Sequence, residues 1–502
     1  MNEISNFSEE FKQLCGDRKD EILAVYSVNG RKTYTYGRTL QLVMAMCAFL
    51  KNSGLKQGDT LVTVLPNSIE AFVCFMASVM SGINYAPLPC TASERECNNW
   101  IRLVSPKLII NKCDIVDYAF PISNVETPCD GNMDWLQAED CPLPENPVSR
   151  VYLMTSGTTG TPKAMSINVN VLWSSGKRFV AFYHLNDSAV RFWNYLPMSY
   201  LGGLFNLAMI PLACGGSFVI AEPFSGKTIL NFWEFVIANE ITAIWFVPSI
   251  VQGLLKLMKM VGLKKIKEYV PKIKICFLGT APIKLSTKQE FEEMLGIILY
   301  ENFALSETTF LTAETKDNIR FREQSSVGEV MPHIDMKIRK IDGIDDVGTI
   351  CVKTPYLFEG YVDENGKTEL ELDADGYFDT KDLGYFNEDG LLVLSGRNRD
   401  IIKKGGNFVS LVEIEKLVGE LPQVEECVAV PIEHDFYGES YILCIIPSDT
   451  SKEDNPDEQI RLWLLNNIVP YKMPETIRIC REFPRTASGK VQKNRLRQET
   501  NG

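Results

Sequence analysis

The sequence predicts an α/β protein with a large N-terminal domain and a small C-terminal one. Over the first part of the chain, segments with helical periodicity alternate with short apolar runs, a pattern typical of a mostly parallel sheet covered by helices. After residue 327 the pattern changes to alternating strands separated by Asp-Gly and Asn-Gly turns, which indicates antiparallel pairing. At 502 residues the chain is also too long for a single hydrophobic core.

Helix and strand signals follow one another along the N-terminal part. Residues 37–52 carry apolar side chains at helical spacing and stop before Gly54, which predicts a helix. The spacings Asn67 to Glu70 and Thr91 to Glu94 are those of a capping box and mark two further helix starts. The expected helices are 37–52, 71–80 and one from about 171, and the expected strands are 60–65, 107–111, 151–154, 217–221, 243–247 and 273–278.

Two stretches of this part differ from the rest. Residues 120–146 are acidic and loop-like, so we expect a surface connection there. Residues 192–221 are uncharged but contain Pro197, Pro211 and glycines, whereas a membrane-spanning helix needs roughly 20 mostly uninterrupted apolar residues. A buried helix followed by a strand is expected instead, and no membrane span. Whether this part is one large α/β unit or two similar subdomains stays open.

The C-terminal part reads as a β-rich subdomain followed by a small α+β domain. Arg397 opens a separately patterned segment of about 100 residues, the size of a small domain. We therefore expect domains at 1–396 and 397–502. The expected strands are 335–339, 348–353, 391–395, 424–431 and 440–446, the expected helices are 413–419 and 459–467, and turns are expected at 342–343, 365–366, 375–376 and 389–390.

The composition excludes several classes of protein. A formal net charge of −13 leaves no basic surplus for phosphate backbones, so no nucleic-acid partner is expected. The 14 cysteines are scattered without a Cys-x-x-Cys pair, and the three histidines are well separated, so neither a disulfide framework nor a histidine metal site is expected. The first 20 residues are polar and acidic, unlike a secretory signal. These features predict a reduced, cytoplasmic protein.

The strand at 151–154 leads into a loop with the composition of a phosphate cradle. Gly157 and Gly160 allow close backbone approach to a ligand, and Lys163 adds a positive charge. The spacing is not that of a Walker A loop, which requires Gly-x-x-x-x-Gly-Lys-Ser/Thr. The alternative is a solvated turn. Hydroxyl groups come from Thr155, Ser156, Thr158, Thr159 and Thr161.

The run Ser-Gly-Thr-Thr-Gly-Thr-Pro-Lys at 156–163 resembles the signature loop of the adenylate-forming superfamily. This superfamily contains acyl-CoA synthetases, aryl-acid ligases, amino-acid adenylation domains and luciferases. The chain departs from it at Ala164, where the family has glycine, and at Ile167 and Asn168, near the place of a Ser-His pair. The resemblance implies a large AMP-binding domain and a small, mobile domain that carries a catalytic lysine.

Two later segments resemble the part of the family that binds the adenine. The turn Gly279-Thr280-Ala281-Pro282 is similar to the Gly-Gly-Ala-Pro turn that passes along the base. The segment Asn302-Phe303-Ala304-Leu305-Ser306-Glu307 is similar to Asn-Tyr-Gly-x-Thr-Glu. Its aromatic ring is suited to stacking on a purine, and its glutamate is suited to Mg²⁺ held mainly by phosphates. Without the family, Phe303 would be a core residue and Glu307 a helix-start carboxylate. Ala304 and Ser306 depart from the family pattern.

Two further segments resemble the part that holds the ribose and joins the domains. The first is Tyr-Phe-Asp-Thr-Lys-Asp-Leu-Gly at 377–384. Asp382 occupies the place of the family aspartate that accepts hydrogen bonds from both ribose hydroxyls, and Lys381 replaces a family glycine. In the run from Ser395 to Glu415, the resemblance implies that Arg397 binds ribose or phosphate oxygens and that Arg399 is the hinge. It also implies a phosphopantetheine thiol channel lined by Gly405, Gly406 and Asn407.

The last segment, Pro-Arg-Thr-Ala-Ser-Gly-Lys at 484–490, matches the family pattern at every fixed position. The resemblance makes Lys490 the lysine that drives adenylation. The alternative is a basic nucleic-acid tail, which the net charge disfavours. That tail would comprise Arg485, Lys490, Lys493, Arg495 and Arg497.

The resemblance implies an ATP-dependent ligase that joins a carboxylic acid to a thiol. A carboxylate attacks the α-phosphorus of ATP, pyrophosphate leaves, and a thiol of CoA or of a separate acyl or peptidyl carrier protein then attacks the acyl-adenylate. Mg²⁺ on Glu307 is implied as well. The segment 199–206 has no acidic residue to pair with an α-ammonium group, which favours an uncharged or aromatic acyl group. Tyr200, Gly202 and Gly203 are the candidate acyl-pocket residues.

Other functions stay open at this point. Within the superfamily, these are an amino-acid-activating ligase for a carrier protein, an enzyme that transfers the acyl group to an amine, and a luciferase-like oxygenase, whose peroxisomal tripeptide is missing from the end Thr500-Asn501-Gly502. No carrier domain is expected after Lys490. From a different class, a catalytically inactive nucleotide sensor would keep the cradle and lose the chemistry. Ala164, Ala304 and Lys381 are the substitutions that keep this alternative open.

Overall fold

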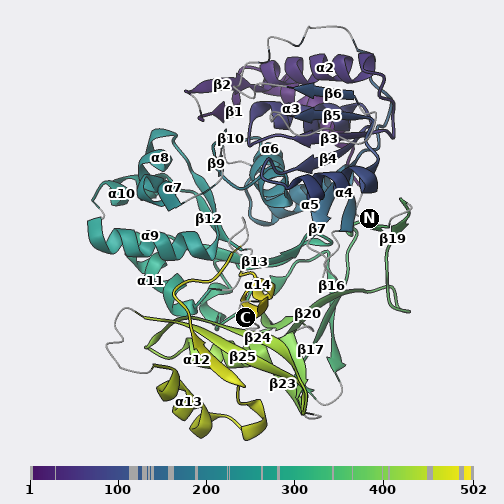
Figure 1. The fold of residues 1–502 in the computed structure, drawn as a ribbon. Coiled ribbons are helices and arrows are strands. Elements are labelled where there is room, and N and C mark those ends of the chain that lie inside the picture. The colour runs from purple at the N-terminus through teal and green to yellow at the C-terminus, as the bar shows by residue number, and fades with distance from the viewer. Residues whose placement is uncertain are drawn as a thin grey trace.

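The computed structural model describes residues 4–28, 30–111, 123–126, 133, 136, 141–155, 163–186, 190–222, 224, 226–261, 264–279, 283–341, 344–363, 366–397, 400–404, 407–448, 456–485 and 491–498. Over these residues the strands form four sheets, of nine, eight, four and five strands (Figure 1). Two sheets are mixed and mostly parallel, and the third is antiparallel. The expected α/β class is confirmed.

The first sheet has the strand order β15-β14-β13-β12-β11-β9-β10-β1-β2. Its central strands, from β13 to β1, pair in parallel, whereas β2, β14 and β15 are antiparallel. Strands β10, β11 and β12 are buried along their whole length, and Ser217 is their one polar residue, as expected for a sheet covered on both faces. The strands are β1 (Ile22–Tyr26), β2 (Lys32–Thr35), β9 (Arg191–Asn194), β10 (Ser217–Ile220), β11 (Ala243–Phe246), β12 (Ile275–Leu278), β13 (Leu299–Leu305), β14 (Thr309–Ala313) and β15 (Glu329–Val330).

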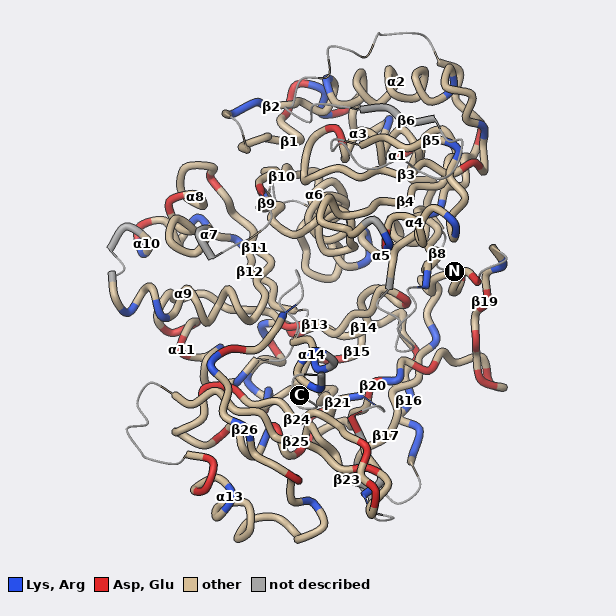
Figure 2. The backbone as a smooth tube through the Cα atoms, in the orientation of Figure 1, with Lys and Arg blue, Asp and Glu red and all other residues tan. Residues whose placement is uncertain are grey.

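The second sheet has the order β19-β18-β8-β7-β4-β3-β5-β6 and is parallel from β7 to β6. Strands β3 and β4 carry no charged residue, whereas Figure 2 shows charged residues along the loops and helices around them. The strands are β3 (Thr60–Val64), β4 (Asn84–Leu88), β5 (Leu108–Asn111), β6 (Ser123–Glu126), β7 (Arg150–Thr155), β8 (Lys163–Asn168), β18 (Gly360–Val362) and β19 (Thr368–Glu369).

Helices cover these two sheets, and several begin at side-chain caps. The predicted starts were displaced: Ser68 rather than Asn67 caps α3, and Ser93 with Glu96 forms the capping box of α4. Asn67 instead bonds to the backbone of Leu196 and Met198. The helices are α1 (Phe7–Asp17), α2 (Tyr36–Asn52), α3 (Ile69–Met80), α4 (Glu94–Val104), α5 (Val169–Phe182), the π-helix η1 (Gly202–Met209), α6 (Ile210–Ala213), α7 (Gly226–Leu230), α8 (Phe232–Ala238), α9 (Pro248–Val261), α10 (Lys264–Tyr269), α11 (Leu285–Leu295) and the 3-10 turns η2 (Val270–Lys272) and η3 (Ile319–Phe321).

The first two sheets share one apolar core. Apolar residues of both, such as Leu23 on β1 and Leu61 on β3, belong to the same buried cluster. On α5, Phe179 is fully buried. Its ring centroid lies 5.5 Å from that of Trp245 and 4.0 Å from that of Phe310. Aromatic packing of this kind fixes α5 against the first sheet.

The C-terminal half contains the third and fourth sheets. The third is antiparallel, in the order β16-β17-β20-β21, and the fourth combines β22 to β26 with three helices. The fourth sheet has a separate core around Ile402, Leu443 and Leu464, and in Figure 1 it lies below the large unit. The elements are β16 (Asp335–Ile341), β17 (Ile344–Lys353), β20 (Phe378–Phe386), β21 (Leu392–Arg397), β22 (Ile401–Lys404), β23 (Asn407–Ser410), α12 (Leu411–Gly419), β24 (Val424–His434), β25 (Gly438–Pro447), α13 (Pro456–Asn467), η5 (Pro470–Lys472), β26 (Thr476–Ile479) and α14 (Lys493–Gln498).

Of the 26 strands in the described residues, 15 were not predicted from the sequence, and four of these lie beside predicted segments. β6 interrupts the predicted connection at 120–146, β8 separates the phosphate loop from α5, β9 precedes the uncharged helix, and β20 carries the Thr-Lys-Asp segment. The domain boundary at 396/397 falls between the last two residues of β21 and stays a prediction. Of the turns, 375–376 and 389–390 are present, and 342–343 and residue 365 lie outside the described residues. No helix in the described part is long and apolar enough to cross a membrane.

Replacement of Phe179 by alanine tests the role of the aromatic packing. We expect Phe179→Ala to lower the free energy of unfolding by about 3–5 kcal/mol, because it leaves a cavity among several rings. Met260→Ala is the control, since Met260 is 84% exposed, and its effect should stay within about 0.5 kcal/mol. Urea denaturation measures both. Equal losses in the two variants would contradict the packing role.

Candidate active site

The predicted adenine segments meet where the parallel strands of the first sheet end. β12 and β13 are neighbours, with Leu278 paired to Glu301, so Gly279 and Asn302 follow on adjacent strands. A Cβ atom at Gly279 would lie 3.5 Å from Trp245 Nε1 and 3.7 Å from Asn302 Oδ1. Asn302 Nδ2 is buried and has no hydrogen-bond acceptor among the described residues. A buried amide donor therefore lies at the edge where α/β sheets bind ligands. Thr280, Ala281 and Pro282 lie outside the described residues.

Phe303, Ala304 and Ser306 follow on β13 and in the turn after it. Phe303 is only 8% exposed and belongs to the main core. A bulge between Phe303 and Ala304 shifts the pairing with β14, and Ala304 is exposed whereas Ser306 is half-buried. Bulges re-aim side chains next to sites. Here the bulge separates the buried ring from the exposed residues that follow.

The ends of the phosphate loop are joined by strand pairing. Thr155, the last residue of β7, is the cross-strand partner of Lys163, the first residue of β8. Residues 156–162, with Ser156, Gly157, Thr158, Thr159 and Gly160, lie outside the described residues. The hairpin therefore fixes where the predicted cradle begins and ends.

Tyr361 lies between the lysine of this hairpin and Glu307. The Tyr361 hydroxyl donates a 2.6 Å hydrogen bond to Glu307 Oε1. Lys163 Nζ lies 5.6 Å from the centroid of the Tyr361 ring, which is within cation–π range. Burial and the Glu307 carboxylate raise the pKa of the Tyr361 phenol, so it stays a neutral donor. Glu307 lies in the β13–β14 turn and not at a helix start. One phenol thus joins the candidate phosphate lysine and the candidate metal ligand.

Glu307 fits the metal that the sequence implies. It is a partly exposed carboxylate whose Oε1 is oriented by Tyr361. Mg²⁺ accepts one or two protein carboxylates and completes its shell with phosphate and water oxygens. Such an ion would offset phosphate charge beside Lys163.

The third sheet brings Asp382 and Arg397 together. They are cross-strand partners on β20 and β21, and Arg397 Nε lies 2.8 Å from Asp382 Oδ1. Asp382 is 6% exposed, whereas the Arg397 side chain is 44% exposed. Asp382 N also donates to Thr380 Oγ1. The guanidinium therefore orients the buried carboxylate and presents its own free edge outward.

Lys381, at a family glycine position, adopts a backbone conformation that suits glycine. Its φ is +61°, which costs an ordinary side chain about 1–2 kcal/mol. Asp379 accepts from Lys381 N at 2.8 Å and lies 3.2 Å from Lys381 Nζ. These contacts hold the lysine in place, and Thr380 and Asp382 remain on either side of it.

The candidate acyl-pocket residues lie at the start of the π-helix η1. Tyr200 is 42% exposed. A Cβ atom at Gly203 would lie 2.4 Å from the backbone oxygens of Leu196 and Pro197, so backbone occupies the space beside it. One at Gly202 would meet side-chain atoms of Leu196, the nearest of them Cδ1 at 3.0 Å.

The C-terminal segments are placed in part. Arg485 and Val491 form a β-bridge, and Gln492 N donates to Pro484 O; Lys490, between them, lies outside the described residues, as do Arg399, Gly405 and Gly406. Asn407 pairs with Lys404 across the β22–β23 hairpin.

Residues of the alternative basic tail form ion pairs within the chain. Arg485 Nη2 contacts Glu426, and Lys493 Nζ lies 3.1 Å from Asp400 and 3.0 Å from Glu415. Burial opposes the charge of Lys493, but the two carboxylates outweigh it and raise its pKa. These neighbours disfavour the nucleic-acid reading.

Sequence reasoning missed two residues of this site, Trp245 and Tyr361. Trp245 lies in an apolar run that reads as core. Tyr361 reaches the site because β18 pairs with β8, with Tyr361 opposite Met165. The pairing joins segments almost 200 residues apart, and no local sequence pattern predicts it. The local signal was the glycine before Tyr361. Gly360 has a φ of +133°, a backbone conformation that favours glycine.

The two pocket glycines provide a matched pair of variants. Gly203→Ala should lower the free energy of unfolding by about 1–3 kcal/mol, as overpacking against fixed backbone does. Gly202→Ala should have a smaller effect, because its neighbour is a side-chain atom that can move. Both variants gain the same helix propensity, so the difference reports the contact. Urea denaturation of both measures it, and equal stability would contradict the contact.

Known proteins resemble the chain over its whole length. The family model "AMP-binding enzyme" matches residues 11–362, and the model "AMP-binding enzyme C-terminal domain" matches residues 413–490. Oxalate–CoA ligase of Arabidopsis thaliana is 27% identical over 93% of each chain. 2-Succinylbenzoate–CoA ligase of Listeria monocytogenes is 27% identical over 99% of this chain and 94% of the relative. ATP-bound MatB of Rhodopseudomonas palustris superposes with a TM-score of 0.86 at 24% identity, over 98% of each chain. The chain therefore belongs to the AMP-binding enzyme family, which is the adenylate-forming superfamily that its motifs resemble.

Proposed function

We propose that the chain is an ATP-dependent carboxylic acid–CoA ligase that forms an acyl-adenylate and releases pyrophosphate. The observation that carries this proposal is the contact of Tyr361 with both Glu307 and Lys163. It brings a carboxylate suited to Mg²⁺ and the lysine of the phosphate loop to one place. Relatives named as CoA ligases support the choice of acceptor.

The chemistry requires two anions to meet. The carboxylate oxygen of the acid attacks the α-phosphorus while the bond to pyrophosphate breaks, so catalysis consists of positioning and charge neutralisation. We assign the β- and γ-phosphates to the 155–163 loop, and the ribose hydroxyls to Asp382 with Arg397. Gly279, Asn302 and Phe303 take the adenine side. Lys490 bridges the attacking carboxylate and the α-phosphate.

The second half-reaction moves the acyl group to sulfur. The thiolate of CoA attacks the acyl carbon, and AMP leaves with the electrons of the broken C–O bond. We assign the thiol route to the β22–β23 hairpin, with Gly405, Gly406 and Asn407, after rotation about Arg399. A small-molecule acid is the substrate, and we keep the preference for an acyl group without an α-ammonium. The cytoplasm remains the expected location.

A panel of acids tests the function directly. We expect ATP–pyrophosphate exchange with at least one class among short dicarboxylates, aryl acids and simple aliphatic acids, and none with α-amino acids. Thioester should then form with CoA alone. Exchange without thioester until a carrier protein or an amine is added would change the acceptor. ATP binding with a blank panel would favour the inactive sensor and reject the ligase.

Lys490→Ala separates adenylation from nucleotide binding. We expect acid-dependent pyrophosphate exchange to fall at least about 100-fold, because a charge-stabilising contact of the transition state is worth about 3 kcal/mol or more. The dissociation constant of ATP, measured by calorimetry, should change little. Arg495→Ala is the control, since this exposed cation lies in the same segment. Exchange at the wild-type rate in Lys490→Ala would overturn the assignment.

A further inference from the structure

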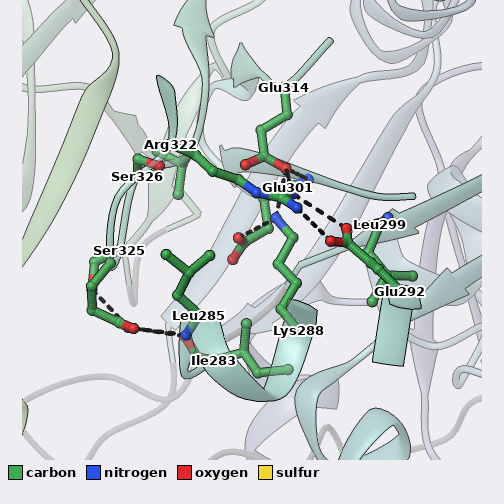
Figure 3. Close-up of polar contacts among 12 residues, drawn as sticks. Ile283, Leu285, Lys288, Glu292, Leu299, Glu301, Glu314, Arg322, Ser325 and Ser326 are labelled. Carbon is green, nitrogen blue, oxygen red and sulfur yellow. Dashed lines mark hydrogen bonds and ion pairs between the residues drawn. The ribbon is translucent and has the colours of Figure 1, made fainter. Parts of the chain in front are cut away.

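A buried ionic cluster lies behind the nucleotide edge of the first sheet. It consists of Lys288 and Glu292 of α11, Glu301 of β13, Glu314 after β14 and Arg322 after η3 (Figure 3). Lys288 Nζ lies 2.7 Å from Glu301 Oε2 and 2.6 Å from Glu314 Oε2, and Arg322 contacts Glu292 and Glu314. The side chains of Lys288 and Glu314 have no solvent exposure.

The cluster holds three carboxyl groups and two cations, so its charges balance only when one carboxyl group is protonated. Burial and the neighbouring Glu314 raise the pKa of Glu301 to about 7, against the opposing pull of Lys288 and Arg322. Glu314 Oε1 is also buried, with no hydrogen-bond partner among the described residues. The phenols of Tyr183 and Tyr300 face Glu314 as well, and burial raises their pKa values. They therefore supply no negative charge near neutral pH.

The cluster forms hydrogen bonds with the backbone of β13 at Glu301, one residue before Asn302. Glu301 N donates to Glu314 Oε2 at 2.8 Å, and Glu314 N donates to Glu301 O at 2.8 Å. On the other side of the adenine turn, Gln324 accepts from Leu285 N and donates to Ile283 O. The strand that carries Asn302 and the segment that follows the adenine turn are thus held by groups that the proposed chemistry does not use.

We propose that Lys288 and Glu314 are positioning residues for the nucleotide, and that the cluster must retain one proton to hold Asn302 and Phe303 in place. This inference rests on the proposed function, because it assumes that these two residues face ATP. A cluster that only stabilised the fold would alter unfolding but leave the affinity for ATP, once folded, unchanged.

Glu301→Gln tests the role of the proton. The variant keeps the amide oxygen that can accept from Lys288 and cannot ionise. Wild-type protein should lose ATP affinity as pH rises through about 7, and the variant should not. The dissociation constants are measured by calorimetry with MgATP. Dividing the wild-type constant by that of the variant cancels the titration of ATP itself. We expect this ratio to rise about five- to tenfold between pH 6 and pH 8.5, close to the tenfold that 1.4 kcal/mol represents.

The sign of the stability effect follows from the same pKa. The folded state binds this proton more tightly than the unfolded chain, whose glutamate titrates near 4.3. Stability from this group therefore falls as pH rises from about 4.3 to about 7 and is level above that range. Glu301→Gln should remove the fall. Glu290→Gln is the control, because Glu290 lies on α11 in an exposed pair with Lys259. The ratio of the wild-type dissociation constant for MgATP to that of Glu290→Gln should not change with pH.

Charge balance gives a second arm. Lys288→Met leaves one cation with three carboxyl groups and should weaken ATP binding more than tenfold, whereas Lys288→Met/Glu314→Gln restores the wild-type balance and should recover most of it. A flat Glu301→Gln ratio, or a single variant that unfolds more easily yet binds ATP normally, would overturn the inference. Should Lys288→Met fail to fold, the Glu301→Gln ratio decides alone. Wild-type protein that does not bind ATP would reject the proposed function instead.

Discussion

Parallel pairing is the constraint on which the site depends. Parallel strands end at a common edge, and β11, β12 and β13 pair in parallel with Leu278 opposite both Phe246 and Glu301. Gly279 and Asn302 therefore come together although they are distant in sequence. The antiparallel additions, β8 with β18 and β14 with β13, then turn Lys163, Glu307 and Tyr361 toward one another. The parallel strands provide the edge, and the antiparallel ones provide the charged groups.

The exposed and the buried ion pairs of the molecule differ in what they contribute to the structure. Exposed pairs such as Lys367–Glu369 contribute about 0–1 kcal/mol. The Lys288–Glu314 pair is fully buried, and buried pairs of this kind often add little net stability while being costly to break. Their physical value lies in geometry, because a charged group without water tolerates few arrangements. The Asp382–Arg397 pair lies between these limits, with one partner buried and one exposed.

The order of the site segments and 11 of the 26 strands in the described part of the chain could be predicted from the sequence, because both rest on local patterns. The helix 37–52 and the strands at 217–221 and 243–247 match α2, β10 and β11 within a residue. Strand β8 was missed because its residues follow a loop and precede a helix without a turn signal. Tyr361 and the partners of Lys288 were missed because their significance arises only from pairing between distant segments. Lys381 was flagged as a departure, yet only the structure shows that its φ is positive and that Asp379 holds it.

The contacts between the two units of the chain carry a consequence for how they respond to their surroundings. Lys256 Nζ lies 2.5 Å from Glu425 with both side chains substantially exposed, and Lys284 Nζ donates to the carbonyl of Val424. Each unit keeps its own apolar core. Ion pairs between exposed side chains weaken as dissolved salt is added. We therefore expect added salt to weaken the Lys256–Glu425 pair and to leave the two cores intact, so the placement of the small unit should be more sensitive to ionic strength than the fold of either unit.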